Sequence, residues 1–187
     1  MASIAIDPAY RRMSVREFLA LDLGDAKAEL VDGLILMMAG GSRVHAAIAA
    51  NLILALGNRL RGTGCRPYGS DLALRTGEAS IRFPDVSVYC RDDFTGEPEF
   101  GKLLGVPRLV FEVLSPSTAS NDQITKLAEY RLLPGLEAIV FIDPSTERVR
   151  LVETGDVRES GWLPAGSDLP LAGLGISLPH AEIFEDL

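Results

Sequence analysis

Two carboxylates and one lysine in the middle of the chain are residue types that could carry out metal-dependent chemistry. Asp85 lies in one apolar segment, Glu112 lies in a second, and Lys126 follows in a more polar segment. Carboxylate oxygens are the ligands that Mg²⁺ prefers. A bound Mg²⁺ polarises a phosphate and lowers the pKa of a bound water, and an ammonium can hold that water or offset developing negative charge. These residues are the minimum set for a magnesium-dependent phosphodiesterase.

The elements that must hold these side chains are two strands and a helix. Residues 81–90 and 108–114 are rich in β-branched and aromatic residues, and a proline in or just before each run prevents it from being the interior of a helix. Residues 118–133 are predicted to form the helix that carries Lys126, ended by a Pro-Gly pair. The other predicted elements are a helix at 14–21, a hairpin at 29–38 with an Asp-Gly turn, a helix at 43–61, strands at 66–68 and 71–75, a strand pair at 137–142 and 148–153, and a short C-terminal helix.

One string in the chain is highly specific. It is Glu-Val-Leu-Ser-Pro-Ser-Thr at 112–118. With Phe-Pro-Asp-Val-Ser-Val at 83–88 upstream, and Asp122, Lys126 and Tyr130 downstream, it resembles the Uma-two family, whose bacterial members are described as restriction-endonuclease-like. The segment 28–33 is similar to the opening hairpin of that family, and the resemblance covers nearly the whole chain.

The resemblance implies the PD-(D/E)XK nuclease fold, an α/β restriction-endonuclease-like fold with a central mixed β-sheet flanked by helices. It also implies that Asp85 and Glu112 are metal-binding acids, and we expect the backbone carbonyl of Val113 to be a third protein ligand. Glu29 is a further candidate metal ligand, because an acid from the N-terminal region often contributes in this superfamily; the alternative is an exposed carboxylate at a strand edge. The expected cofactor is Mg²⁺, with Mn²⁺ as a substitute.

One departure from the superfamily pattern concerns the lysine. The pattern has a lysine two residues after the glutamate, and here that position is Leu114. In a strand, Glu112 and Leu114 point to the same face, so a leucine occupies the expected catalytic position. Lys126 is the natural substitute, because its helix can pack back over the sheet, and the resemblance implies such a migrated lysine. The alternative is a surface lysine that pairs with Asp122 or Glu129 on its own helix.

His45 is a further candidate, in the first turn of the helix predicted at 43–61. A neutral imidazole can bind a metal or accept a proton, whereas a lone histidine is more often a structural hydrogen-bonding residue. The resemblance implies that His45 lies near the mouth of the active site. Asp122 could orient Lys126, or it could simply favour the positive N-terminal end of its helix.

The charge of the chain argues against tight binding to nucleic acid. The formal net charge is −8, and affinity for phosphate comes mainly from Lys and Arg. The charge is uneven, because residues 1–91 hold 11 basic and 9 acidic side chains (+2) and residues 92–187 hold 7 and 17 (−10). The arginines of the first half could form a cationic surface or be scattered and solvated: Arg11, Arg12, Arg16, Arg43, Arg59, Arg61, Arg66, Arg75 and Arg82.

Length and composition are those of one globular domain over residues 1–187, with 47% hydrophobic residues. No apolar run approaches the roughly 20 residues that cross a bilayer, and the first residues do not resemble a secretory signal. Cys65 and Cys90 have no metal-ligand spacing. We therefore expect a cytoplasmic protein with reduced, structural thiols and no membrane partner. The apolar content of residues 169–183 favours a homodimer, and a two-fold dimer is the commonest oligomer of soluble proteins.

The sequence thus favours a metal-dependent nuclease that hydrolyses DNA phosphodiester bonds by an activated water, with Asp85, Glu112 and Lys126 as catalytic residues. The competing interpretation is a catalytically silent binding or scaffold module that keeps the fold. It is favoured by the acidic charge and by Leu114. Binding of a divalent ion distinguishes the two, because a nuclease needs the ion and a silent module does not.

Overall fold

A five-stranded mixed sheet forms the centre of the molecule. The computed structural model describes residues 11–38, 40–93, 102–115, 121–155 and 161–187, without the side chains of residues 121 and 122. The strand order is β3-β6-β7-β8-β9, in which β7 and β8 are parallel and the other neighbours are antiparallel. The strands are β3 (Cys65–Gly69), β6 (Val86–Cys90), β7 (Leu109–Val113), β8 (Ala138–Asp143) and β9 (Arg148–Glu153).

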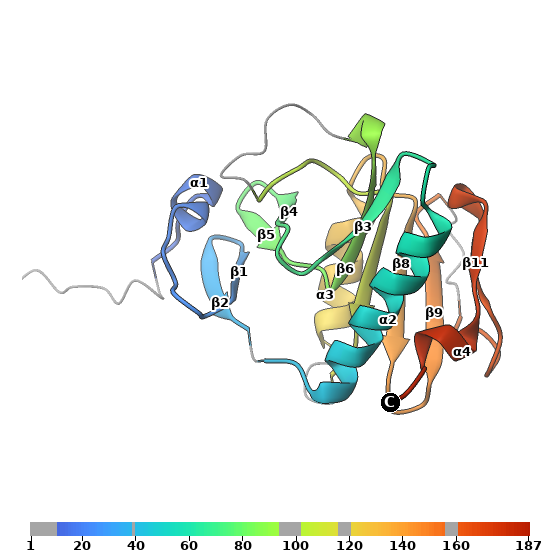
Figure 1. Ribbon diagram of the computed structural model, residues 1–187. Helices are drawn as coiled ribbons and strands as arrows, with labels where there is room; N and C mark the ends of the chain where they lie inside the picture. Colours follow the sequence, from blue (N-terminus) through green and yellow to red (C-terminus); the bar gives the residue numbers. More distant parts are fainter. Residues whose placement is uncertain (1–10, 39, 94–101, 116–120, 156–160) are drawn as a thin grey trace, which may run out of the picture.

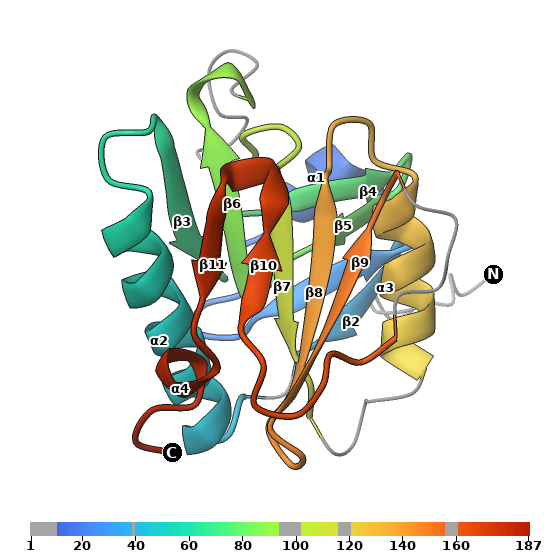
Figure 2. The same cartoon turned by 90° about the vertical axis from the view of Figure 1, so that its right-hand side faces the viewer.

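Helices and a hairpin cover the two faces of this sheet (Figures 1 and 2). One face carries α2 (Arg43–Arg59), α4 (His180–Ile183) and the hairpin of β10 (Leu169–Leu171) and β11 (Ile176–Leu178). The other face carries α3 (Asn121–Arg131). A central mixed sheet flanked by helices is therefore confirmed.

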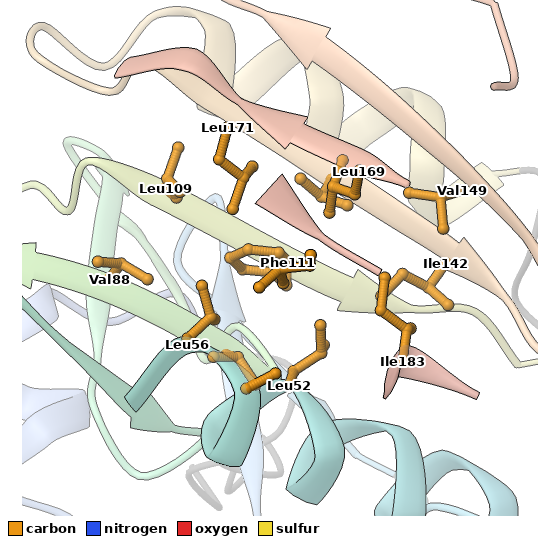
Figure 3. Packing of buried hydrophobic residues seen from close by; sticks show 14 of the residues in the cluster. Leu52, Leu56, Val88, Leu109, Phe111, Ile142, Val149, Leu169, Leu171 and Ile183 are labelled. Carbon is orange, nitrogen blue, oxygen red and sulfur yellow. The ribbon is translucent and has the colours of Figure 1, made fainter. Parts of the chain in front are cut away.

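Strand β7 contributes buried side chains to the hydrophobic clusters on both faces of the central sheet, because its side chains point alternately to one face and the other. Phe111 is fully buried among residues of α2, β8 and β10, as Figure 3 shows. Val110 points the other way and packs with Tyr130 of α3. Burying one such side chain stabilises the fold by about 1.5–3 kcal/mol. The alternation also directs Glu112, two residues after Val110, toward α3.

A second, four-stranded sheet lies beside the first on the α3 side (Figure 1). Its order is β2-β1-β5-β4. The predicted hairpin is confirmed, because Asp32 and Gly33 both have positive φ, at 48° and 83°, as a two-residue turn of this kind requires. The helix α1 (Val15–Leu19) begins with the predicted capping box at Ser14. The strands are β1 (Ala28–Val31), β2 (Leu34–Met37), β4 (Leu74–Gly77) and β5 (Ser80–Arg82).

The prediction of one continuous strand over 81–90 is wrong. The structure divides that segment into β5, which pairs with β1 and β4, and β6, which pairs with β3 and β7. Pro84 lies at the break, and a proline cannot donate a ladder hydrogen bond in the interior of a sheet. As a result Arg82 ends a strand of the second sheet, and three residues later Asp85 precedes a strand of the central sheet.

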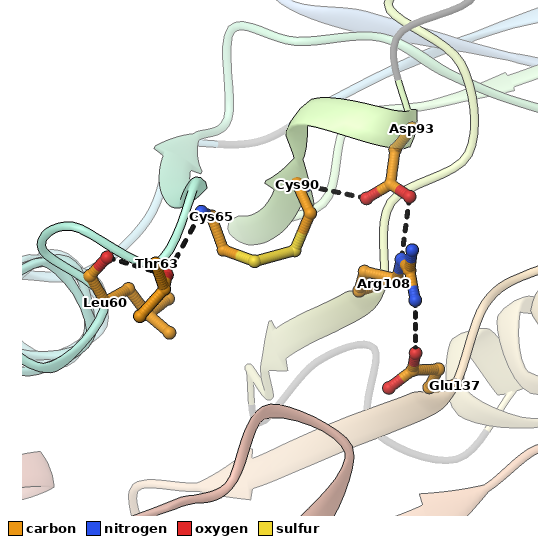
Figure 4. Close-up of a disulfide and its surroundings, with 7 residues drawn as sticks. All are labelled: Leu60, Thr63, Cys65, Cys90, Asp93, Arg108 and Glu137. Carbon is orange, nitrogen blue, oxygen red and sulfur yellow. Dashed lines mark hydrogen bonds and ion pairs between the residues drawn. A yellow bond between two sulfur atoms is a disulfide. The ribbon is translucent and has the colours of Figure 1, made fainter.

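The prediction of reduced cysteines is also wrong. Cys65 and Cys90 form a disulfide, which Figure 4 shows. The two residues face each other directly in the antiparallel pairing of β3 and β6. Their separation of 25 residues gives no sign of this, because only the strand register brings the two side chains together.

Two surface predictions also change. The apolar residues of 169–183 that favoured a homodimer are buried against the central sheet of the same chain, as Leu169 and Ile183 show at 0% exposure. The homodimer itself stays a prediction. The arginines do not all contribute to a cationic surface, because Arg82 is buried and Arg59 pairs with Glu182.

In the part of the chain that the structure describes, no helix has the length and apolarity to span a membrane.

Candidate active site

Asp85 is held at the start of β6, beside the end of β7. Val86 pairs with Phe111 in the antiparallel ladder, so Asp85 lies next to the last residues of β7. The backbone N–H of Val113 donates a hydrogen bond of 2.7 Å to Asp85 Oδ2. Two acids that lie 27 residues apart in the sequence, Asp85 and Glu112, therefore come together where these strands adjoin.

Glu112 is a buried carboxylate that faces α3. The hydroxyl of Tyr130 donates to Glu112 Oε1 at 2.6 Å, and Lys126 Nζ lies 2.9 Å from Glu112 Oε2. Burial, which Lys126 opposes and the charge of Asp85 reinforces, raises the pKa of Glu112 to about 7. An additional positive charge near Glu112 would favour its ionised form.

Lys126 points into this site rather than into solvent. Its side chain is 14% exposed, and Nζ also lies 3.6 Å from Glu29 Oε1. Burial alone would lower the pKa of Lys126, but the charges of Glu112 and Glu29 outweigh it and raise that pKa, which keeps the ammonium charged. The structure thus brings Lys126 to the acids, and the alternative of a surface lysine paired with Glu129 is wrong. The side chain of Asp122 lies outside the described residues.

Leu114 occupies the position that the superfamily pattern gives to lysine. It is partly buried and packs against a cluster that includes Tyr130. The leucine therefore helps to fix α3 on the sheet. The helix in turn presents Lys126 and Tyr130, four residues apart on one face, to the same glutamate.

Glu29 is buried, not exposed at a strand edge. Its Oε2 accepts a hydrogen bond of 2.8 Å from Arg82, and its Oε1 accepts one of 3.3 Å from the backbone N–H of Phe83. Arg82 also binds Glu129 of α3. Sequence reasoning missed this use of Arg82, although an arginine between Ile81 and Phe83 in an apolar run was a signal that it is buried and paired.

His45 contacts the site from the first turn of α2. Its Nε2 lies 3.2 Å from Asp85 Oδ2. The hydrogen bond to Asp85 raises the pKa of His45, although partial burial opposes the shift. The place near the acids that the resemblance implied for His45 agrees with this geometry.

Comparison with known proteins assigns the family. The Uma2 family model, described as "Putative restriction endonuclease", matches residues 15–181. The chain belongs to the Uma2 family. It is 31% identical to the uncharacterized protein slr1290 of Synechocystis over 86% of this chain and 85% of the relative. It is 32% identical to the uncharacterized protein sll1609 of the same organism over 73% of this chain and 76% of that protein.

A solved structure has the same fold. The crystal structure of a "putative nuclease belonging to DUF820" from Anabaena variabilis superposes with a TM-score of 0.78 at 18% identity. The superposition covers 92% of this chain and 97% of the other. At that identity the likeness concerns the fold, and it confirms the restriction-endonuclease-like architecture expected of a Uma2 protein.

The Uma2 site has a donor set that suits Mg²⁺. Among the residues described, no three or more His, Cys, Asp or Glu side chains form a group that could hold a metal ion. Mg²⁺ does not need such a group, because it usually keeps several waters and binds one or two carboxylates. Asp85 and Glu112 supply two hard oxygen donors, and Glu112 is buried, so a cation beside it would stabilise its charge. The structure does not bring Glu29 into a metal-holding group with them.

Substituting Gly41 by alanine should displace the His45 ring in this Uma2 chain. A Cβ atom at Gly41 would lie 2.8 Å from His45 Nδ1, closer than real contacts allow. The ring can rotate away at small cost, so we expect the His45–Asp85 contact to break while the free energy of unfolding changes by less than about 1 kcal/mol. The ¹⁵N chemical shifts of the His45 ring report this change.

Gly40 provides the matched control, because a Cβ atom there would meet nothing within 4 Å. The Gly40→Ala variant should keep the His45 signals of the wild type. Identical ring shifts in Gly41→Ala and the wild type would show that His45 is not held against Asp85 in this way.

Proposed function

We propose that this chain is a metal-dependent nuclease that hydrolyses DNA phosphodiester bonds by water attack. One observation carries the proposal. Although Leu114 has replaced the lysine of the superfamily pattern, Lys126 Nζ lies 2.9 Å from Glu112 Oε2. Lys126 is 14% exposed and lies on α3 rather than β7, so its pair with Glu112 is not one of the exposed surface pairs that contribute little to stability. Membership of a family described as "Putative restriction endonuclease" supports the same proposal.

The proposed roles follow from the contacts of each side chain. Asp85 and Glu112, together with the backbone carbonyl of Val113, would hold Mg²⁺ or Mn²⁺. A cation held there would supply polarisation of the phosphate and a lowered pKa of a nearby water. Lys126 orients the attacking water and offsets negative charge that develops on the phosphate. Tyr130 holds Glu112 in one orientation through the 2.6 Å hydrogen bond.

A cleavage assay tests the proposal. The purified protein is incubated with Mg²⁺ or Mn²⁺ and single-stranded, duplex or branched DNA, beside the Glu112→Gln variant and the Glu153→Gln control, which changes an exposed acid at the end of β9. We expect cleavage by the wild type and the control and none by Glu112→Gln. Cleavage that persists undiminished in Glu112→Gln, or no cleavage of any substrate by the wild type, contradicts the proposal.

Divalent metal should also raise the melting temperature. Binding to the folded state alone stabilises it by about 2.7 kcal/mol when the free metal is 100 times its Kd. We expect Mg²⁺ or Mn²⁺ to raise Tm relative to a chelator in the wild type, and expect the shift to disappear in Asp85→Asn. Differential scanning calorimetry measures both. Superimposable curves with metal and with chelator would count against a metal site formed by Asp85 and Glu112.

The second candidate is a catalytically silent module that keeps the fold. It is favoured by the net charge of −8, which opposes binding to DNA. It is also favoured by Glu112, whose two oxygens already accept hydrogen bonds from Tyr130 and Lys126. Such a module requires neither divalent-ion binding nor cleavage, so the two experiments above separate the candidates.

A further inference from the structure

Arg82 is a buried cation that joins three elements around the proposed active site. Its side chain is 4% exposed. Nη1 donates to Glu29 Oε2 of β1 at 2.8 Å, while Nε and Nη2 bind the two oxygens of Glu129 on α3 at 2.8 and 2.6 Å. The hydroxyl of Thr76 on β4 completes the environment of Glu129 at 2.7 Å. The second sheet is thus bonded through Arg82 to the helix that carries Lys126.

Glu29 extends this network to the lysine. One oxygen of Glu29 is bound by Arg82, and the other accepts from the N–H of Phe83 and lies 3.6 Å from Lys126 Nζ. Glu29 therefore faces two cations, Arg82 and Lys126, which balance its charge, whereas Glu112 forms its ion pair in the described residues with Lys126. The Lys126 ammonium is therefore within ion-pair distance of both Glu29 and Glu112.

We propose that Glu29 and Arg82 are positioning residues for Lys126, and that Glu29 is not a metal ligand. The inference rests on the proposed function for the catalytic importance of Lys126, but the geometry can be tested without catalysis.

A lysine on a helix needs such a device more than a lysine on the strand does. In the superfamily pattern the lysine is two residues from the glutamate and shares its strand, whereas Lys126 is 14 residues from Glu112 and on another element. A lysine side chain has about 1.5–2 kcal/mol of rotamer freedom to lose on ordering. Arg82 fixes the face of α3 through Glu129, and Glu29 draws the ammonium toward the second sheet. Together Arg82 and Glu29 fix the position of the Lys126 ammonium. This position matters because a misplacement of 1 Å in an active site can lower the rate roughly 100-fold.

The chain is well suited to a direct observation of Lys126, because it contains three lysines, Lys27, Lys102 and Lys126. Lys27 and Lys102 are exposed, whereas Lys126 is only 14% exposed and is paired with Glu112. In protein labelled with ¹⁵N-lysine, a slowly exchanging NH₃⁺ signal should therefore come from Lys126, and its loss in Lys126→Met assigns it. A wild type without such a signal would overturn the proposal.

Three variants then test the positioning residues. Glu29→Gln keeps the shape of the side chain and removes its charge, and Arg82→Lys keeps a cation without the bonds to both carboxylates. The matched control is Arg108→Lys, because Arg108 also bridges two carboxylates, Asp93 and Glu137 (Figure 4), at the opposite end of β7. We expect the Lys126 signal to shift or to be lost in both site variants and to stay unchanged in the control. An unchanged signal in both site variants overturns the proposal.

Metal binding and kinetics distinguish positioning from metal ligation. We expect Glu29→Gln to bind Mn²⁺ within roughly threefold of the wild type, and to lower kcat by roughly 10- to 100-fold with little change in the KM for DNA. Loss of Mn²⁺ affinity as large as in Asp85→Asn would show that Glu29 is a ligand after all and would overturn the proposal. A wild type that does not cleave DNA contradicts the proposed function, and the lysine signal and Mn²⁺ affinity then decide the positioning question by themselves.

Discussion

Replacing Lys126 by methionine should reduce DNA cleavage by about 100- to 1,000-fold, the usual effect of removing one group that stabilises charge in a transition state. The variant keeps the length and apolar stem of the side chain and removes the ammonium that lies 2.9 Å from Glu112. Binding of Mn²⁺ should persist and even become tighter, because a neighbouring positive charge has been removed and both proposed acidic ligands remain. Single-turnover cleavage and isothermal titration measure the two quantities.

Lys27→Met is the control for this experiment. Lys27 also pairs with a carboxylate, Asp71 at 2.9 Å, but its side chain is 53% exposed and lies outside the site. This variant should cleave like the wild type. Equal rates for Lys126→Met and Lys27→Met would show that Lys126 takes no part in the reaction.

Replacing Arg82 by methionine should lower the free energy of unfolding by about 3–5 kcal/mol, as is usual when one partner of a buried ion pair is removed. The substitution leaves Glu29, which is 4% exposed, and Glu129, which is 19% exposed, without the guanidinium that binds them both. It also removes the two hydrogen bonds from Arg82 of the second sheet to Glu129 of α3. Urea denaturation followed by circular dichroism measures the loss.

Two further variants show where that loss comes from. The triple variant Arg82→Met, Glu29→Met, Glu129→Met removes Arg82 together with both of its carboxylate partners, while Lys126 keeps its ion pair with Glu112, so much of the stability should return. Arg59→Met breaks a bidentate pair with Glu182, whose side chain is 41% exposed, and should cost no more than about 1 kcal/mol. A loss in Arg82→Met no larger than in Arg59→Met would contradict a buried, tightly coupled network.

The parts of the site that could be predicted from the sequence are those with local signals. Asp85 and Glu112 stood out as acids in apolar runs, and the missing lysine at position 114 directed attention to Lys126. The Asp32-Gly33 turn was predicted because few residue pairs adopt positive φ at two successive positions. Each of these inferences depends on residues close together in the chain or on the string that resembles the family.

The parts that could not be predicted depend on contacts between distant segments. The exposure of Glu29 was undecided because its partner Arg82 lies 53 residues away, on a strand that joins β1 only through the second sheet. Pro84 is evident in the sequence, but the sequence does not show that the segments before and after it belong to different sheets. The disulfide likewise depends on the register of β3 against β6.

The placement of Lys126 on α3 has a consequence for folding and local opening. In the superfamily pattern the glutamate and the lysine are on one strand, so both would take their places when that strand joins its sheet. Here β7 can form and hold its acid while α3 is still detached, so the lysine joins the site only when the helix docks. Sub-global opening of a single helix generally requires less free energy than global unfolding. The fraction of molecules with a complete site is therefore set by the docking equilibrium of α3, which hydrogen exchange of its backbone amides can report separately from the stability of the central sheet.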